Sequence, residues 1–524
     1  MPVSGPLEIG LLVAAVIVFT PFSEWVRLPQ PVVLTIVGIA FGFVPGVAGP
    51  DLPPEWILPI VLPPLLFAAT QRTTLTEFRE HASEVLLLAV GLTIATTAVA
   101  AVVAHAVGVP WAAAWVLGAI VSPPDPVAAT AVARRLRLPH RLVTILEGEG
   151  MFNDATALVL YKVTLIAVVS GHLSVARTGL LLVLTVVVGV AVGYVLALAT
   201  RQALRWIDDP YTETTLTVLV PFVTYVLAER LEGSGVLAVL ILGLMLRNIG
   251  HEETTSQGWL LGRSVWEYAD FLITSLAFTV LGIEVTMVIT GAHLTGETLR
   301  LAGSVVLTIV IFRGLWVVSS AWLARARARR QGALLPVGWR ETAVVSWAGM
   351  RGVVTVATAL ALPHTIDGGG ELPWRTELTV TALFTIVATL VVQGLTLAPL
   401  TTRLGVGGEN GSQREVTRLR ERAAAAALEF VRGEASEQVV PEVREAAVLR
   451  YDGFLSSQKA MERARRLESD DGSDAAAELA SLLRRATDIE RRLVLDARRL
   501  GEVSAESADD VLRDIEARAL RDFG

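Results

Sequence analysis

The sequence contains no cysteine, so disulfide bonds and thiol chemistry are excluded and the redox compartment cannot be inferred. Lysine is almost absent, since Lys162 and Lys459 are the only two and arginine carries the rest of the positive charge. The chain also lacks a Walker motif, a Rossmann fingerprint, a nucleophile elbow and an HExxH motif. We therefore expect no enzyme activity, no cofactor and no nucleotide hydrolysis. The mild net charge of −7 gives no indication of a nucleic-acid partner.

Long apolar runs dominate the remaining sequence. Hydrophobic residues make up 53% of the chain, and the mean hydropathy is +0.57. The apolar residues fall in runs of about 18–25, which is the length needed to cross a bilayer core. The sequence thus predicts an all-α polytopic membrane protein with about 13 transmembrane helices. They are expected to start near Pro6, Pro31, Trp56, Glu84, Trp111, Arg141, Val175, Thr212, Ser234, Val265, Thr298, Glu341 and Glu377.

The placement of arginine predicts the orientation of these spans. One alternating set of loops carries roughly 16 arginines and the other roughly four, and the basic set is expected on the cytoplasmic side. This puts the N-terminus outside and the C-terminus inside a cell inner (plasma) membrane, in agreement with an odd number of spans. Met1 to Glu8 lacks the basic region of a signal peptide, so the first run is expected to be retained. The basic set is Arg27, Arg72, Arg79, Arg134, Arg135, Arg137, Arg141, Arg201, Arg205, Arg247, Arg263, Arg325, Arg327, Arg329, Arg330 and Arg340.

The composition changes after Leu404. We predict a transmembrane domain over residues 1–404, a Gly-rich linker over 405–412 and a cytoplasmic helical tail over 413–524. Within the tail, helical periodicity covers Arg414–Arg432, Pro441–Leu467 and Ala475–Leu500. Solvated helices that pack together or dimerise are favoured over a ligand-sensing domain.

Polar residues inside the spans indicate where function lies, because charges at membrane depth are costly. In span five, Pro123, Pro124 and Pro126 flank Asp125 within the segment Ser122–Ala128. Proline removes an N–H donor and clashes with the preceding turn, so a regular helix cannot continue here. Unwound backbone at this depth must line a cavity or be buried in protein. Asp125 is either part of a cation site or a cap on the second half-helix, and the two roles are compatible.

Span six carries three carboxylates and an amide within Glu147–Asp154. Glu149 and Asn153 are four residues apart and share a helix face, and Asp154 lies one step round. Burial of a carboxyl group in an apolar setting favours its protonated form. Such a group can hold either a proton or a cation, which is the competition that an antiporter requires. A satisfied core aspartate is the alternative interpretation.

Span twelve places Arg351 between Gly349 and Gly352, with apolar residues on both sides. A buried arginine requires a carboxylate partner, and the candidates at a similar depth are Glu147, Glu149 and Asp154. Pairing with Glu149 would leave Asp154 free to titrate. For the other charges in the spans, we expect Lys162 to extend to the outer surface and Glu284 and Arg313 to form packing ion pairs.

Together these residues resemble the monovalent cation/proton antiporters of the sodium/proton exchanger type. The resemblance covers roughly residues 6–404. It rests on four segments in matching order, which are Ser122–Ala128, Glu147–Ala155, Gly349–Val354 and Val392–Pro399.

The resemblance implies a fold of two inverted six-helix repeats after one extra helix, with broken helices at spans five and twelve that cross near the midplane. It implies that Asp154 binds the transported Na+ and H+, that Asn153, Asp125 and Ser122 support the site, and that Glu149 and Arg351 form a buried ion pair. It further implies a homodimer in membrane lipid that serves pH homeostasis. In this family, members with asparagine at the position of Asn153 look electroneutral in their exchange. The resemblance therefore implies that one ion exchanges for one proton.

Three departures from the family pattern concern oxygen ligands. Gly150 replaces a serine, Pro124 replaces a hydroxyl residue, and Leu65–Ala69 lacks a glutamate that some members carry. Water or the backbone carbonyls of Ser122 or Pro123 would have to substitute. The sequence therefore favours exchange of Na+ or Li+ for H+, with K+/H+ exchange as the alternative. A membrane sensor that signals through its tail is a further alternative, although the tail carries no effector motif.

Overall fold

The structure is a computed structural model. Its chain forms two compact units, Met1–Glu409 and Asn410–Gly524, and each is described by itself. The structure describes residues 5–26, 28–44, 53–71, 86–125, 129–130, 138, 140–170, 175–291, 295–331, 338–366, 370, 372–406, 411–433, 441–471, 475–499, 511–512, 515 and 517. Several residues on which the predictions rest lie outside these ranges, namely Pro126–Ala128, residues 407–410 of the linker, and Arg27, Arg72, Arg79, Arg134, Arg135 and Arg137.

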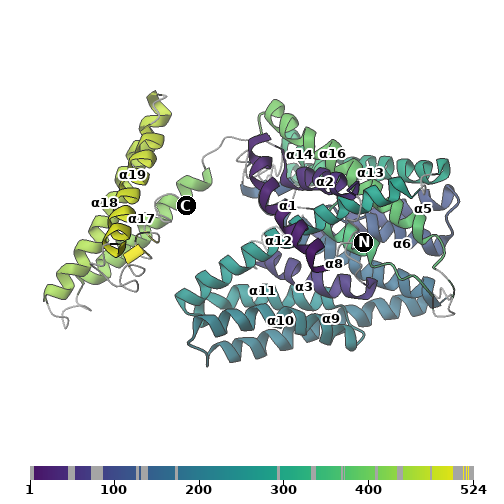
Figure 1. The fold of residues 1–524 in the computed structure, drawn as a ribbon, viewed down its shortest axis with the longest axis horizontal. Coiled ribbons are helices and arrows are strands. Elements are labelled where there is room, and N and C mark those ends of the chain that lie inside the picture. Colours follow the sequence, from purple (N-terminus) through teal and green to yellow (C-terminus); the bar gives the residue numbers. More distant parts are fainter. Residues whose placement is uncertain are drawn as a thin grey trace. The chain divides into compact units, whose positions relative to one another are not determined.

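The first unit is built from helices, as the apolar runs predict (Figure 1). Seven helices within the described part are long and apolar enough to cross a membrane, and shorter apolar helices accompany them. The helices are α1 (Gly5–Val26), α2 (Gln30–Gly42), α3 (Pro54–Thr70), the π-helical η1 (Leu87–Leu92) continuing into α5 (Thr93–Ala106), α6 (Trp111–Val121), α8 (His140–Ser170), α9 (Val175–Leu204), α10 (Pro210–Arg230), α11 (Gly235–Glu253), α12 (Ser256–Thr290), α13 (Gly296–Gln331), α14 (Trp339–Trp347), α15 (Val353–Leu360) and α16 (Arg375–Leu404).

Proline and aspartate mark where several of these helices begin. Pro31, Pro54 and Pro210 each lie in the first turn of a helix. Proline is tolerated there because a backbone N–H in the first turn has no acceptor within the helix. Asp209 caps α10, because its carboxylate accepts a hydrogen bond of 2.8 Å from the backbone N–H of Thr212. The local sequence therefore sets these helix starts.

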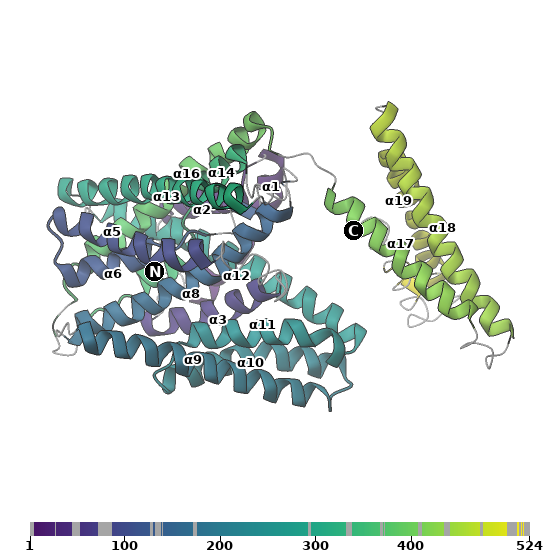
Figure 2. The same cartoon turned by 180° about the vertical axis from the view of Figure 1, so that it is seen from behind.

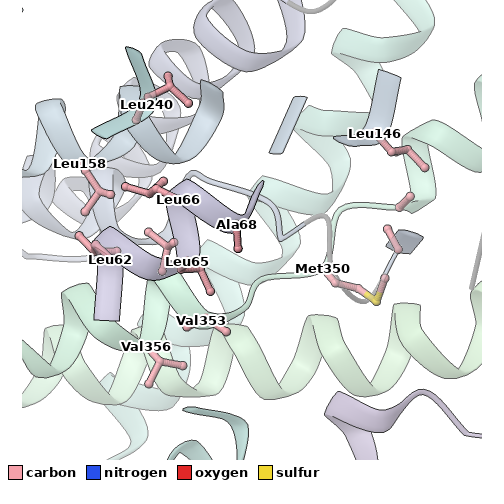
Figure 3. Packing of buried hydrophobic residues seen from close by; sticks show 14 of the residues in the cluster. Leu62, Leu65, Leu66, Ala68, Leu146, Leu158, Leu240, Met350, Val353 and Val356 are labelled. Carbon is pink, nitrogen blue, oxygen red and sulfur yellow. The ribbon is translucent and has the colours of Figure 1, made fainter. Parts of the chain in front are cut away.

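The contacts between helices divide the first unit into two bundles. Helices α9, α10 and α11 lie side by side in one of them (Figure 2). The first bundle contains α1–α3 and α9–α12, and the second contains η1, α5, α6, α8 and α13–α16. Close approach of α2 and α12 depends on Gly38, where a Cβ atom would collide with the carbonyl oxygen of Thr279. Leu62 of α3, Leu158 of α8, Leu240 of α11 and Val356 of α15 belong to one buried cluster that joins the two bundles (Figure 3).

Outward faces of the membrane helices are apolar. Leu184, Val187, Tyr194 and Val195 of α9 are all exposed. Side chains of this kind would be unfavourable in water and match the hydrocarbon core of a bilayer. The apolar outer surface therefore agrees with the prediction of several transmembrane helices.

The second unit consists of α17 (Gly411–Arg432), α18 (Pro441–Asp471) and α19 (Ala475–Arg499), with α18 packed against both others. These helices cover the three segments whose periodicity predicted them. The guanidinium of Arg444 donates to the carbonyl oxygens of Val431 and Arg432 at the end of α17. It thereby satisfies carbonyl groups that have no partner within their own helix.

Candidate functional site

Two helix breaks meet in the middle of the first unit. Helix α6 ends at Val121, and the chain continues without helical structure through Ser122–Asp125. The second break separates α14 from α15 at residues 348–352. The backbone N–H of Asp125 donates to the carbonyl oxygen of Met350 at 2.6 Å, so the two breaks are in direct contact. Both breaks fall where the prolines of span five and the glycines of span twelve predicted them.

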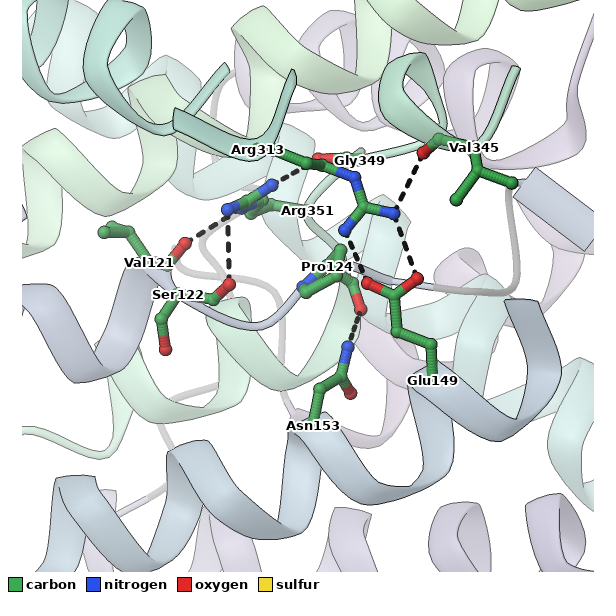
Figure 4. A network of polar contacts seen from close by, with 9 residues as sticks. All are labelled: Val121, Ser122, Pro124, Glu149, Asn153, Arg313, Val345, Gly349 and Arg351. Atoms are coloured by element: carbon green, nitrogen blue, oxygen red, sulfur yellow. Dashed lines mark hydrogen bonds and ion pairs between the residues drawn. The ribbon is translucent and has the colours of Figure 1, made fainter. Parts of the chain in front are cut away.

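Arg351 occupies the crossing and satisfies carbonyl groups that the break in α6 leaves free (Figure 4). Its Nε donates to Val121 O at 2.8 Å, and its Nη2 donates to Ser122 O at 3.2 Å. Its Nη1 donates to the carbonyl oxygen of Gly349. A cation here offsets the negative end of the α6 dipole and replaces hydrogen bonds that the helix cannot make.

The predicted ion pair between Glu149 and Arg351 is wrong. Glu149 instead accepts two hydrogen bonds from Arg313 of α13, at 2.5 Å from Nη1 and 3.0 Å from Nη2 (Figure 4). Arg313 Nη2 also donates to Val345 O at 3.1 Å. Arg351 is only 2% exposed, and the described hydrogen bonds of its guanidinium go to carbonyl oxygens. Gly349 makes room for this arrangement, because a Cβ atom there would collide with the Arg313 side chain.

Asn153 holds the first break in place. Its Nδ2 donates to Pro124 O at 2.8 Å, across from α8 to the unwound segment. The side chain is fully buried, so this bond is protected from water. The Oγ of Ser122 donates to Ala119 O at 3.2 Å. Asn153 and Ser122 therefore organise the break, and neither lines the cavity beside it.

Asp125 and Asp154 line one cavity between the two bundles, which we call the acidic cavity. The absence of a Cβ at Gly352 allows the Asp125 carboxylate to lie directly against the backbone at the start of α15. Among the residues that the structure describes, Asp154 forms no ion pair, and both buried arginines are engaged elsewhere. The cavity is lined by Leu65, Leu66, Ala69, Pro123, Asp125, Thr130, Glu147, Gly150, Asp154, Asp270, Gly352, Val353, Val354 and Thr355.

Several lining residues were not found from the sequence. Asp270 lies near the start of span ten, and only a carboxylate among apolar residues could have indicated it. Thr355 carries a buried Oγ1 with no hydrogen-bond partner in the described part of the chain, although a single hydroxyl in an apolar helix gives no signal. Glu147, which the sequence offered as a candidate partner of Arg351, lines the acidic cavity.

Two further charges have partners that the sequence did not reveal. Lys162 does not simply extend to the surface, because its Nζ contacts Glu229 Oε2 of α10 at 2.7 Å. The same Nζ donates to Gly233 O at 2.7 Å. Arg313 pairs with Glu149 across the interior of the second bundle.

Helix breaks that cross inside a polytopic bundle, with charged groups at the crossing, define a secondary transporter of the ion-coupled class. A family model described as "Sodium/hydrogen exchanger, transmembrane" matches residues 11–403. The chain belongs to this family of membrane cation/proton antiporters. The resemblance seen in the sequence motifs is thereby confirmed.

Individual relatives agree with this assignment. A sodium/proton exchanger of Mycobacterium tuberculosis is 31% identical over 502 residues, which is 94% of this chain and 90% of the relative. The Na+/H+ antiporter ApNhaP of Aphanothece halophytica is 29% identical over 80% of this chain and 77% of its own. The solved sodium/proton antiporter MjNhaP1 of Methanocaldococcus jannaschii has a TM-score of 0.59 at 18% identity, over 76% of this chain and 98% of that one. This last likeness concerns the fold.

Proposed function

We propose that this protein exchanges one Na+ or Li+ for one H+ and that the two compete for the carboxylate of Asp154. One observation carries the proposal: Asp154 lies in the acidic cavity beside the crossing, while Glu149 takes Arg313 and carbonyl groups take Arg351. An arginine bound to Asp154 would hold that carboxylate charged and block exchange. The arrangement leaves it available to bind a proton or a cation.

The ion would be bound by few protein ligands. Among the described residues, no three acidic or histidine side chains form a group that could hold a metal ion. Gly150 and Leu65 line the cavity at positions where family members can carry side-chain oxygen ligands. Neither residue has a side-chain oxygen, so neither side chain can bind the ion. A bound ion would therefore combine Asp154 with backbone carbonyls, water and the hydroxyl of Thr355. Sodium is a hard cation and suits such a set of oxygen ligands.

Asparagine at position 153 supports electroneutral exchange, as the resemblance to the family implies. This side chain donates its N–H to Pro124 O and carries no charge to neutralise. One carboxylate that alternates between a proton and a monovalent cation moves no net charge. We expect Asn153→Asp to weaken the hydrogen bond to the break and to make transport respond to membrane potential. An unchanged insensitivity to valinomycin-imposed potentials in that variant would contradict this role.

The proposed setting is a cell inner (plasma) membrane, with the N-terminus outside and the tail cytoplasmic. Arginine asymmetry between the two sets of loops supports this orientation. The exposed apolar face of α9 supports contact with lipid or with a second copy in a homodimer.

Everted membrane vesicles with a pH-sensitive dye test the proposal. Addition of Na+ should dissipate a pre-formed proton gradient in the wild-type protein and not in Asp154→Asn or Asp154→Ala. Asp208→Asn is the matched control, because Asp208 is exposed in the turn before α10. Dissipation that persists in both Asp154 variants would reject the site.

Potassium is the alternative ion. A relative from Bacillus subtilis, 30% identical over 399 residues, is named a sodium, potassium, lithium and rubidium/H+ antiporter. Titration of Na+, Li+ and K+ in the same vesicles separates the two possibilities. Half-maximal dissipation at a lower concentration of K+ than of Na+ would favour K+/H+ exchange.

A further inference from the structure

A second cavity lies on the other side of the buried cluster from the acidic cavity, and its lining comes from α3, α8 and the end of α15, which also line the acidic cavity, and from α10. The acidic cavity uses Leu65–Ala69 of α3, Glu147–Asp154 of α8 and Val353–Thr355 of α15. The second cavity uses Leu58 and Pro59 of α3, Tyr161 and Leu165 of α8, and Ala361 just beyond α15. On each of these helices, the residues that line the second cavity are displaced along the helix axis from those that line the acidic cavity. The two cavities therefore follow one another along a single route through the helices.

The two cavities are separated by a thin apolar layer. Leu62 of α3 is 0% exposed, Leu158 of α8 is 4% exposed and Val356 of α15 is 3% exposed. All three belong to the same buried cluster (Figure 3). Each residue lies between the positions that its own helix contributes to the two cavities. No polar side chain is needed to keep water and ions out of such a layer.

An ion pair between Lys162 and Glu229, which we call the latch, joins the two bundles beside the second cavity. Lys162 belongs to α8 of the second bundle, and Glu229 belongs to α10 of the first. Glu229 lines the second cavity, its Oε2 binds Lys162 at 2.7 Å, and its Oε1 accepts the backbone N–H of Gly235 at 2.9 Å. Lys162 also binds Gly233 O at 2.7 Å. These contacts fix α8 to the α10–α11 turn at one end of the molecule only.

The latch acts on the helix that carries the proposed ion site. Lys162 follows Asp154 by eight residues, which places it about 12 Å further along α8. At this end, the contacts of Lys162 with Glu229 and Gly233 resist movement of α8 relative to α10. The second cavity opens to the surface beside Glu55 and Arg230, which line it and are exposed.

We propose that the second cavity is the access route from the side opposite the acidic cavity, and that Lys162 and Glu229 are gating residues that hold the apolar layer between the two cavities closed. In the orientation proposed above, this is the outer side of the membrane. The inference rests on the proposed function for its meaning, since a route to Asp154 matters only to a transporter. Opening requires that the ammonium of Lys162 leave Glu229 and that the layer at Leu62 and Leu158 separate.

Thiol labelling tests this gate without measuring transport. The chain has no cysteine, so a single introduced cysteine is the only reactive thiol. In right-side-out vesicles with an impermeant methanethiosulfonate reagent, Leu58→Cys in the second cavity should be labelled, and Leu62→Cys in the apolar layer should be labelled slowly. Lys162→Met and Glu229→Gln should each speed labelling of Leu62→Cys about fivefold, the effect expected for a partly exposed ion pair.

Matched variants exclude a general loosening of the fold. Glu229→Gln keeps the Oε1 acceptor for Gly235, and Lys162→Arg keeps the charge, so the latter should label as slowly as the wild type. Arg263→Met breaks an exposed ion pair of 2.8 Å with Glu267 on α12 and should change nothing. Unlabelled Leu58→Cys, or Leu62→Cys labelling that neither latch variant accelerates, overturns the gate. Those results would leave sodium-dependent proton flux intact, whereas failure of the proposed function would abolish that flux and leave labelling unchanged.

Discussion

The buried pair between Glu149 and Arg313 gives a prediction with a defined magnitude. Both side chains are 2–3% exposed, and two hydrogen bonds of 2.5 and 3.0 Å join them. Replacing one partner leaves the other charge buried and uncompensated, which costs roughly 3–5 kcal/mol. After Glu149→Gln, Arg313 keeps Val345 O and the substituted amide oxygen as acceptors, but it has lost the carboxylate charge that compensates its guanidinium.

Replacing both partners removes both charges from the interior. The double variant Glu149→Gln with Arg313→Met should therefore be no less stable than the worse single variant. This predicts a coupling energy of about 3 kcal/mol or more between the two positions. Unfolding in mixed detergent and SDS, followed by tryptophan fluorescence, measures each free energy.

The same cycle with Arg351 is the control. Arg351 binds Val121 O, Ser122 O and Gly349 O, so Arg351→Met should destabilise the protein by losing these bonds. Its coupling to Glu149→Gln should be smaller than that of Arg313, because the described hydrogen bonds of Glu149 go to Arg313 and not to Arg351. A stronger coupling of Glu149 to Arg351 than to Arg313 would refute the pairing of Glu149 with Arg313.

Two further predictions concern the helix breaks and the helix starts. Gly352→Ala should abolish sodium-dependent proton flux and lower the melting temperature, because its Cβ would collide with Asp125, and flux equal to wild type would disprove this contact. The pKa of Asp209 lies below its ordinary value because the Thr212 side chain, and then the Thr212 backbone N–H, donate to its carboxylate. A lowered pKa means that this stabilisation is present above the unfolded pKa and is lost as the pH falls through the folded one. Asp209→Ala should therefore lower the melting temperature near neutral pH by more than in acid, and a difference that grows on acidification would contradict the sign.

Much of the site could be predicted from the sequence because its signals are local. Three prolines around Asp125 forbid a regular helix, and two glycines around Arg351 permit the second break. Asp154 and Asn153 stand out because charge and amide are costly within an apolar run. The helical type of the membrane segments follows in the same way from the length of each apolar run.

What the sequence could not decide is which distant charges meet. Glu149 is 164 residues from Arg313 along the chain. Arg313 and Arg351 are both buried and both call for a nearby carboxylate, so the sequence did not show which of them pairs with Glu149. The choice was made by the packing of α13 against α14, which brings Arg313 to Glu149, and by free carbonyl groups at the end of α6, which take Arg351. Lys162 and Glu229 are likewise joined only by the packing of the two bundles. The sequence alone thus determined where unpaired backbone groups and charges would be energetically costly. The tertiary structure decided which partner compensates each group, because compensation depends on distance in space and not along the chain.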